Sequence, residues 1–124
     1  MRIPTRTGPE PLVHLCGARD WERARQAGEL RPDSLRHAGF VHLSTPAQVH
    51  LPANRLFAGR TDLVLIYLDP GQLGSPVRWE PGVAGDPPGM RFPHLYGPLP
   101  VRAVLAVQAY RPGPGGRFAP PIRG

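Results

Sequence analysis

The sequence predicts an α+β protein, because two helical stretches lie early in the chain and several strand-like stretches lie around and after them. The clearest strand is the uninterrupted apolar run Leu63–Leu68, which ends at Asp69-Pro70-Gly71. A run that is apolar at every position is typical of a central strand buried on both faces. Two shorter stretches, Leu12–Cys16 and Phe40–Leu43, each place a histidine between apolar residues and predict further strands.

The first predicted helix covers residues 18–27. Trp21, Ala24 and Ala27 recur at a spacing of three residues, which puts them on one face of a helix. Gly28 is a natural end, since glycine adopts the left-handed conformation that closes helices. The following residues 29–37 are expected to be irregular, with a turn or a single helical turn at Pro32-Asp33-Ser34.

The second predicted helix begins at Thr45-Pro46 and ends at Gly59. Threonine caps free backbone amides, and proline suits the first helical position. Pro52 lies inside this stretch and lacks a backbone N–H, so the sequence predicts a kink or break there.

The second half of the chain contains two weaker strand signals. Val77–Glu80 predicts a short edge strand, and residues 103–110 predict the last strand. Between them, Pro81–Arg91 is rich in glycine and proline and predicts a lid or binding loop. The segment from Phe92 to Pro100 is expected to be a rigid, proline-pinned loop.

Length and composition indicate one domain. The 124 residues are 40% apolar, which fits a single core that we place at residues 12–111. The terminal segments 1–11 and 112–124 contain little that a core would bury, so we expect both to be flexible.

The charge of +6 comes from arginines scattered along the chain, without a basic block. It favours anionic ligands in general and does not indicate a dedicated nucleic-acid binder. No apolar run is long enough to span a membrane, and residues 1–6 lack the apolar stretch of a signal peptide, so we expect neither feature. Cys16 is the single cysteine, so we expect no internal disulfide and a cytoplasmic location.

Candidate ligand-binding residues lie on the two histidine strands. Neighbouring side chains on a strand point to opposite faces, so Val13 and Leu15 can enter a core while His14 faces a cleft. His42 has the same setting, and Ser44 lies two residues further on the same face. Neutral imidazole binds sugar hydroxyls and charged imidazole binds phosphate, so the pair predicts a ligand site.

Four further residues complete the candidate site. Glu80 offers a general base or a ribose-binding carboxylate, and His94 offers a second proton-transfer group. Tyr96 offers a stacking face for a ring, and Arg55 offers a charge for an anionic ligand. Structural roles explain each of these residues about equally well.

The sequence also contains residues that are typical of two other chemistries, metal binding and thiol catalysis. Three histidines could hold zinc, but HxH and HxxxH spacings are absent and the cysteine stands alone, so we predict no metal site. Cys16 could be a nucleophile beside His14, although a small buried residue next to a strand is the simpler interpretation.

The order of several motifs resembles the bacterial domain of unknown function 952 family. The similarity covers about residues 12–110 and is carried above all by Phe40-Val41-His42-Leu43-Ser44-Thr45 and by Phe92-Pro93-His94-Leu95-Tyr96-Gly97-Pro98-Leu99. Val13-His14-Leu15, Asp20-Trp21-Glu22 and Arg78-Trp79-Glu80 support it at their expected places in the order.

This family is similar in fold to ADP-ribosyltransferases and to the RNA 2′-phosphotransferases that use NAD. The resemblance implies a split antiparallel sheet with two short helices and a cleft between the halves of the sheet. It also implies that His14 matches the histidine that binds the NAD ribose, and that His42-Leu43-Ser44 matches the phosphotransferase form of the second strand.

The chain departs from that pattern at the third strand. A glutamate there supports the ribosyl cation in the resembled enzymes, but residues 92–100 contain no acid, and His94 stands in its place. Glu80 is the nearest carboxylate in sequence. Loss of one preorganised electrostatic group can cost about 10²–10³ in rate, which counts against a standard transferase reaction.

Two functions therefore follow as expectations. The first is a protein that binds NAD, ADP-ribose or a related nucleotide and transfers an ADP-ribosyl or phosphate-linked group, with an RNA 2′-phosphate as the one expected nucleic-acid substrate. The second is a non-catalytic binding or interaction module that has kept the fold and lost turnover.

Overall fold

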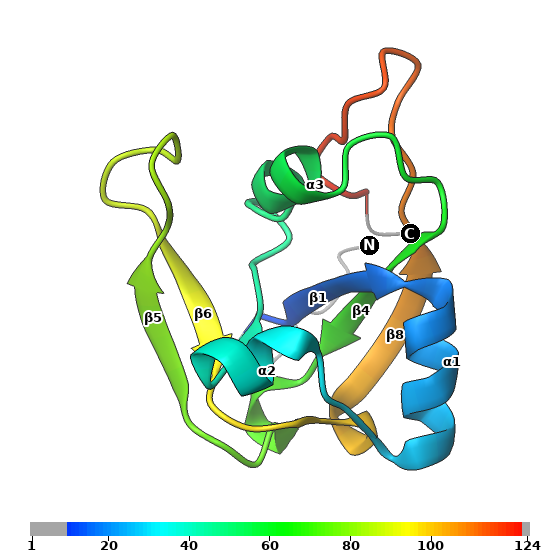
Figure 1. Cartoon of the computed structure of the whole chain (residues 1–124), viewed down its shortest axis with the longest axis vertical. Helices are drawn as coiled ribbons and strands as arrows, with labels where there is room; N and C mark the ends of the chain where they lie inside the picture. The colour runs from blue at the N-terminus through cyan, green and yellow to red at the C-terminus, as the bar shows by residue number, and fades with distance from the viewer. Residues whose placement is uncertain (1–9, 123–124) are drawn as a thin grey trace, which may run out of the picture.

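The computed structural model describes residues 10–122 and confirms the α+β class (Figure 1). Within these residues the chain forms three antiparallel sheets, three α-helices and two 3-10 helices, η1 (Pro70–Gln72) and η2 (Val101–Ala103). None of the helices in this described range is long and apolar enough to cross a membrane. Of the N-terminal segment that we expect to be flexible, residues 1–9 lie outside the described range, and Pro11 is buried.

The first sheet has the order β1-β4-β8. Its strands are β1 (Leu12–Gly17), β4 (Leu63–Leu68) and β8 (Val104–Ala109). On β4, Leu65 and Ile66 are both fully buried, and they belong to the two different apolar clusters on opposite faces of the sheet. The prediction of a central strand buried on both faces is thus confirmed.

The second sheet has the order β3-β6-β5, and Figure 1 shows β5 and β6 standing apart from the first sheet. Its strands are β3 (Val41–His42), β6 (Arg91–Leu95) and β5 (Val77–Pro81). The segment around His94 is therefore a strand, where the sequence predicts a rigid loop. It can pair despite Pro93 because that residue's carbonyl still accepts the Leu43 N–H at 3.0 Å.

The third sheet is a short pair of strands, β2 (Glu29–Leu30) and β7 (Leu99–Pro100). It joins the segment that follows the first helix to the segment that follows β6.

One backbone bridge joins the two larger sheets. The Val13 N–H donates to the Ser44 carbonyl at 2.8 Å, and the Ser44 N–H donates to the Val13 carbonyl at 2.9 Å. Val13 belongs to β1 and Ser44 follows β3, so the sheets meet edge to edge at this point. The two histidine strands are neighbours because of this contact.

Helix α1 (Ala18–Ala27) is as predicted, and Gly28 ends it with φ of 90°. The other two α-helices differ from the sequence prediction in length. Helix α2 (Asp33–Ala38) forms where only a turn or a single helical turn is expected. The Ser34 hydroxyl donates to the Phe40 carbonyl at 2.8 Å, which fixes this helix to β3.

Helix α3 (His50–Leu56) begins later than Thr45, because residues 46–49 form turns before it. Pro52 does not break this helix. It is the third helical residue, and a backbone N–H in the first turn has no partner within the helix to lose. The later start thus removes the conflict that predicted a kink.

The C-terminal segment packs on the domain, whereas the sequence predicts a flexible tail. Phe118 is 3% exposed and lies beside Tyr110, with ring centroids 5.0 Å apart. The Asn54 amide of α3 accepts from the Phe118 N–H at 2.8 Å and donates to its carbonyl at 2.9 Å. The aromatic ring completes the apolar cluster between α3 and the first sheet.

We expect Phe118→Ala to lower the free energy of unfolding by about 3–5 kcal/mol, because it leaves a cavity in this cluster. Urea denaturation measures the change. Ile122→Ala is the matched control, since Ile122 is 88% exposed in the same segment, and it should change stability by less than about 0.5 kcal/mol. Equal, small effects of both substitutions would show that the segment does not pack in solution.

Candidate functional site

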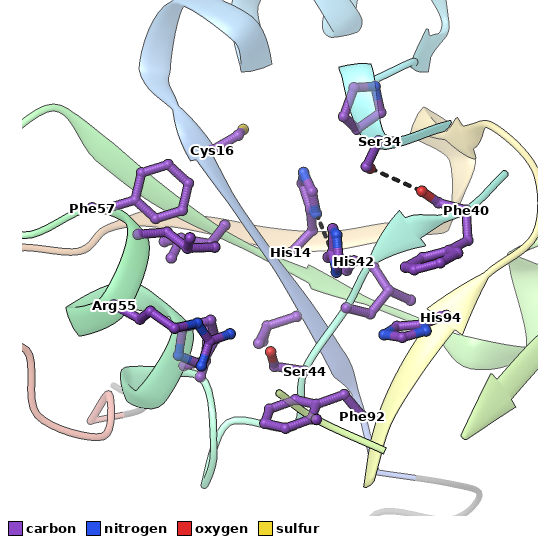
Figure 2. Close-up of a pocket in the computed structure, with 18 of the residues that line it drawn as sticks. His14, Cys16, Ser34, Phe40, His42, Ser44, Arg55, Phe57, Phe92 and His94 are labelled. Carbon is purple, nitrogen blue, oxygen red and sulfur yellow. Dashed lines mark hydrogen bonds between the residues drawn. The ribbon is translucent and has the colours of Figure 1, made fainter. Parts of the chain in front are cut away.

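A cavity of about 510 Å³ lies where β1, β3 and α3 face the β5–β6 hairpin (Figure 2). Its walls are mostly apolar, with a few polar side chains, which is the usual make-up of a small-molecule site. Five of the seven predicted site residues line it: His14, His42, Ser44, Arg55 and His94. The three imidazoles therefore meet at one cavity, although they come from three different strands.

His14 is held by a hydrogen bond across the junction of the sheets. Its Nδ1 lies 2.8 Å from the His42 carbonyl oxygen. A carbonyl only accepts, so Nδ1 carries the proton and donates it, which leaves Nε2 as a free acceptor. Figure 2 shows this bond as a dashed line.

The environment of His14 keeps the ring neutral. The residue is 6% exposed, and burial lowers the pKa of its imidazole to about 4. The bond to the His42 carbonyl opposes this effect without reversing it. At neutral pH the ring is thus a hydrogen-bond acceptor of fixed orientation, suited to a hydroxyl and not to attraction of a phosphate.

His42 is the accessible member of the three. It pairs with His94 across β3 and β6, and the two ring centroids lie 5.4 Å apart at a nearly perpendicular angle. Partial burial lowers the pKa of His42, and the nearby His94 and Arg55 lower it further. Arg55 and His42 line the same cavity.

His94 is buried between an aromatic ring and a carboxylate. The Phe40 ring stacks on it with centroids 3.9 Å apart and planes within 10°. Its Nδ1 lies 2.7 Å from Glu80 Oε1, and because a carboxylate accepts, this nitrogen donates. The second nitrogen, Nε2, is then the one available for proton exchange.

Glu80 and Tyr96 do not line the cavity. The Tyr96 hydroxyl donates to Glu80 Oε1 at 2.6 Å, the same oxygen that receives His94 Nδ1. These two hydrogen bonds, that of Tyr96 first, lower the pKa of Glu80. Arg78 covers the Tyr96 ring at 5.0 Å from its centroid. Glu80 and Tyr96 therefore orient His94, and Tyr96 does not occupy the ligand-stacking place predicted for it.

Arg55 projects from α3 and forms an ion pair with Asp86 of the β5–β6 loop at 3.0 Å. Both residues line the cavity, together with the 5% exposed Ser44. This placement agrees with the prediction that Arg55 lies near the histidine cleft. The anion that Arg55 contacts in the structure is the Asp86 carboxylate.

The remaining sequence hypotheses concern Cys16 and metal binding. Cys16 lines the cavity, but burial raises the pKa of its thiol to about 12, so it is not a thiolate nucleophile at neutral pH. Among residues 10–122, no three His, Cys, Asp or Glu side chains are grouped so that they could hold a metal ion.

Sequence reasoning missed several residues that line the cavity, including Phe40 and Asp86. Phe40 lies two residues before His42, on the same strand face, so extending the alternation that selected Ser44 would have found it. Asp86 carries no such local signal, because its partner Arg55 lies 31 positions away in the chain. Only the folded chain brings these two charges together.

A second cavity of about 580 Å³ adjoins the first. The two share His14, Cys16, Asp20 and Pro32 as wall residues, so His14 stands between the two compartments. Asp20 and Arg23 of α1 bring charged groups to this second space.

Two solved structures of protein CC0527 from Caulobacter crescentus are similar to this fold. The crystal structure is 29% identical in sequence, with a TM-score of 0.74, and the match covers 87% of this chain and 92% of that one. The solution NMR structure is 28% identical, with a TM-score of 0.72, and covers 87% and 90% respectively. No curated protein matches the chain.

The family model described as "Protein of unknown function (DUF952)" matches residues 15–107, which include four of the five predicted residues that line the cavity: His42, Ser44, Arg55 and His94. This match spans most of the chain and confirms the predicted family. The chain belongs to the DUF952 family.

Proposed function

We propose that the cavity binds a nucleotide of the NAD or ADP-ribose type. The observation that carries the proposal is the convergence of His14, His42, His94 and Arg55 on one cavity. A fixed hydroxyl acceptor and a cationic side chain in one apolar space match the ribose and phosphate groups of such a ligand.

We further propose that the fold is of the ADP-ribosyltransferase type. Support comes from the two three-stranded antiparallel sheets, which are joined by the backbone bridge between Val13 and Ser44. A sheet split in this way with a cleft at the split is what the family resemblance implies. The cavity lies at the junction of the two sheets, which supports this assignment.

The size of the site is compatible with a nucleotide. A volume of about 510 Å³ falls within the range of small-molecule pockets, and a second compartment of about 580 Å³ continues from it past His14. NAD and ADP-ribose consist of two halves joined by a pyrophosphate, and two adjoining compartments suit that shape.

Each wall residue has a distinct task in this proposal. His14 Nε2 accepts a hydrogen bond from a ribose hydroxyl, and Arg55 with His42 faces the phosphates. Phe57 and Phe92, which also line the cavity, supply the aromatic contact that Tyr96 does not provide. When NAD is bound, it supplies an ADP-ribosyl group that can be transferred.

The candidate reaction is transfer of an ADP-ribosyl or phosphate-linked group, and an RNA 2′-phosphate is one candidate acceptor. Whichever of these groups is transferred, His94 is the proton-transfer residue. Its Nδ1–H donates to Glu80, so its Nε2 is available for proton exchange. Glu80 is then a positioning residue, since it does not line the cavity.

A non-catalytic binding module is the second candidate, and a specific observation favours it. Of the carboxylates within residues 10–122, Asp20 and Asp86 alone line this cavity, and Asp86 is paired with Arg55. A ribosyl cation would thus lack the support of Glu80. Nicotinamide release from NAD that depends on His94 would favour the transferase, whereas nucleotide binding without release would favour the module.

Binding can be tested by calorimetric titration with ADP-ribose and NAD. We expect the wild type to bind and His14→Asn to bind at least about tenfold more weakly, since the ribose hydroxyl loses its acceptor. Asparagine keeps an N–H near the position of Nδ1, so the bond to the His42 carbonyl can persist and the fold is retained.

His37→Asn is the matched control, because His37 lies on the exposed surface of α2 and outside both cavities. It should leave binding unchanged. Absence of both heat and a thermal shift for the wild type at millimolar nucleotide would contradict the proposal.

The pH dependence of stability tests the state of His14. The unfolded chain takes up this proton near pH 6.5 and the folded chain only near pH 4, so folding loses stability as the pH falls through that interval. Between about pH 7 and about pH 5, the free energy of unfolding should fall by about 2 kcal/mol more in the wild type than in His14→Asn.

Urea denaturation at the two pH values measures this difference. Other titrating groups, including His42, are present in both proteins and cancel from the comparison. Parallel losses of stability in the two proteins would mean that His14 is not held neutral by its surroundings.

A further inference from the structure

The ion pair between Arg55 and Asp86 bridges two walls of the cavity. Arg55 belongs to α3, and Asp86 belongs to the loop between β5 and β6. The Arg55 Nη1 donates to Asp86 Oδ1 at 3.0 Å. The Arg55 side chain is 36% exposed, but that of Asp86 is only 7% exposed. A carboxylate is thus folded inward onto the cation that faces the histidines.

The loop is built to hold the carboxylate in this place. The second oxygen, Asp86 Oδ2, accepts from the Val83 N–H at 2.9 Å. A Cβ atom at Gly82 would lie 2.2 Å from that oxygen and 2.8 Å from a ring carbon of Phe92. Any larger residue at Gly82 would therefore displace Asp86 or Phe92, so the absence of a side chain there allows the inward position of the carboxylate.

We propose that Asp86 is a specificity-determining residue that occupies the anion position of Arg55, so that the cavity admits ligands carrying a phosphate or pyrophosphate group and rejects weaker anions. The inference deepens the nucleotide-binding function proposed above and rests on it. Arg55, Val83 and Gly82 define the position, and the incoming phosphate oxygens take the place of the Asp86 carboxylate.

Charge decides this competition. The Asp86 carboxylate carries one negative charge, and a pyrophosphate carries two with more acceptor oxygens for a guanidinium. Arg55 and His42 both line this cavity, so an anion bound in it can interact with both side chains. A carboxylate ligand carries no more negative charge than the Asp86 side chain, so it gains nothing by replacing it. A neutral nucleoside carries no charge with which to compete for Arg55.

The test compares the calorimetric affinities of ADP-ribose and adenosine for the full chain and its variants. Asp86→Asn removes the competing charge, while its amide oxygen can still accept from Val83 N–H. We expect this variant to bind ADP-ribose about tenfold more tightly than the wild type, which corresponds to about 1.4 kcal/mol. Adenosine carries no phosphate, so its affinity should not change.

A matched control completes the design. Glu22→Gln is the matched control, because Glu22 forms an Arg pair of the same 3.0 Å length on the exposed face of α1, and it should have no effect. Thermal unfolding of each variant confirms that it is folded.

The outcomes separate the two proposals. If the wild type binds ADP-ribose and Asp86→Asn binds it equally or more weakly, the role of Asp86 is refuted and the nucleotide site stands. If Asp86→Asn gains affinity for adenosine as much as for ADP-ribose, Asp86 acts by blocking space and the charge competition is refuted. If wild type and all variants bind no ADP-ribose, both proposals fail.

Discussion

The contact on which the site depends is the antiparallel bridge between Val13 and Ser44. Two backbone hydrogen bonds, of 2.8 and 2.9 Å, join sheets that are otherwise separate three-stranded units. The bridge brings the His42 carbonyl within 2.8 Å of His14 Nδ1. The bridge and the apolar cluster that both sheets share therefore set the relation of the two histidine strands, and with it the orientation of the His14 ring.

Two imidazoles of the cavity are fixed by the same principle with different acceptors. His14 donates its Nδ1 proton to a neutral carbonyl, and His94 donates its Nδ1 proton to the Glu80 carboxylate. In each ring Nε2 takes no part in this bond. The two rings differ in the charge of the group that accepts from Nδ1, which is neutral for His14 and negative for His94. A neutral hydroxyl acceptor and a carboxylate-supported proton carrier in one cavity give the site two separate chemical capacities.

The parts of the structure that sequence predicts best are those set by local pattern. The apolar run Leu63–Leu68 and the helix that ends at Gly28 need only nearby residues, and both are as predicted. The alternation around His42 likewise identifies His42 and Ser44, which both line the cavity. By contrast, the late start of α3 depends on turns at residues 46–49, which propensity alone does not distinguish from a helical turn.

What sequence could not supply is pairing between distant segments. The sequence predicts that Glu80 belongs to the site. In the structure Glu80 accepts hydrogen bonds from His94 and Tyr96 and does not line the cavity. Asp86 and the buried Phe118 likewise have roles only because of residues far away in the chain. The composition of the C-terminal segment predicts flexibility. The segment packs because Phe118 enters an apolar cluster formed by residues that are distant in the sequence.

The most direct measurement is a crystal structure of the protein with ADP-ribose. A ribose hydroxyl should lie within hydrogen-bond distance of His14 Nε2, with the bond from Nδ1 to the His42 carbonyl intact and the pyrophosphate beside Arg55. A nucleotide bound elsewhere on the molecule, or a His14 ring turned away from the His42 carbonyl, would contradict a nucleotide site at the junction of the two sheets.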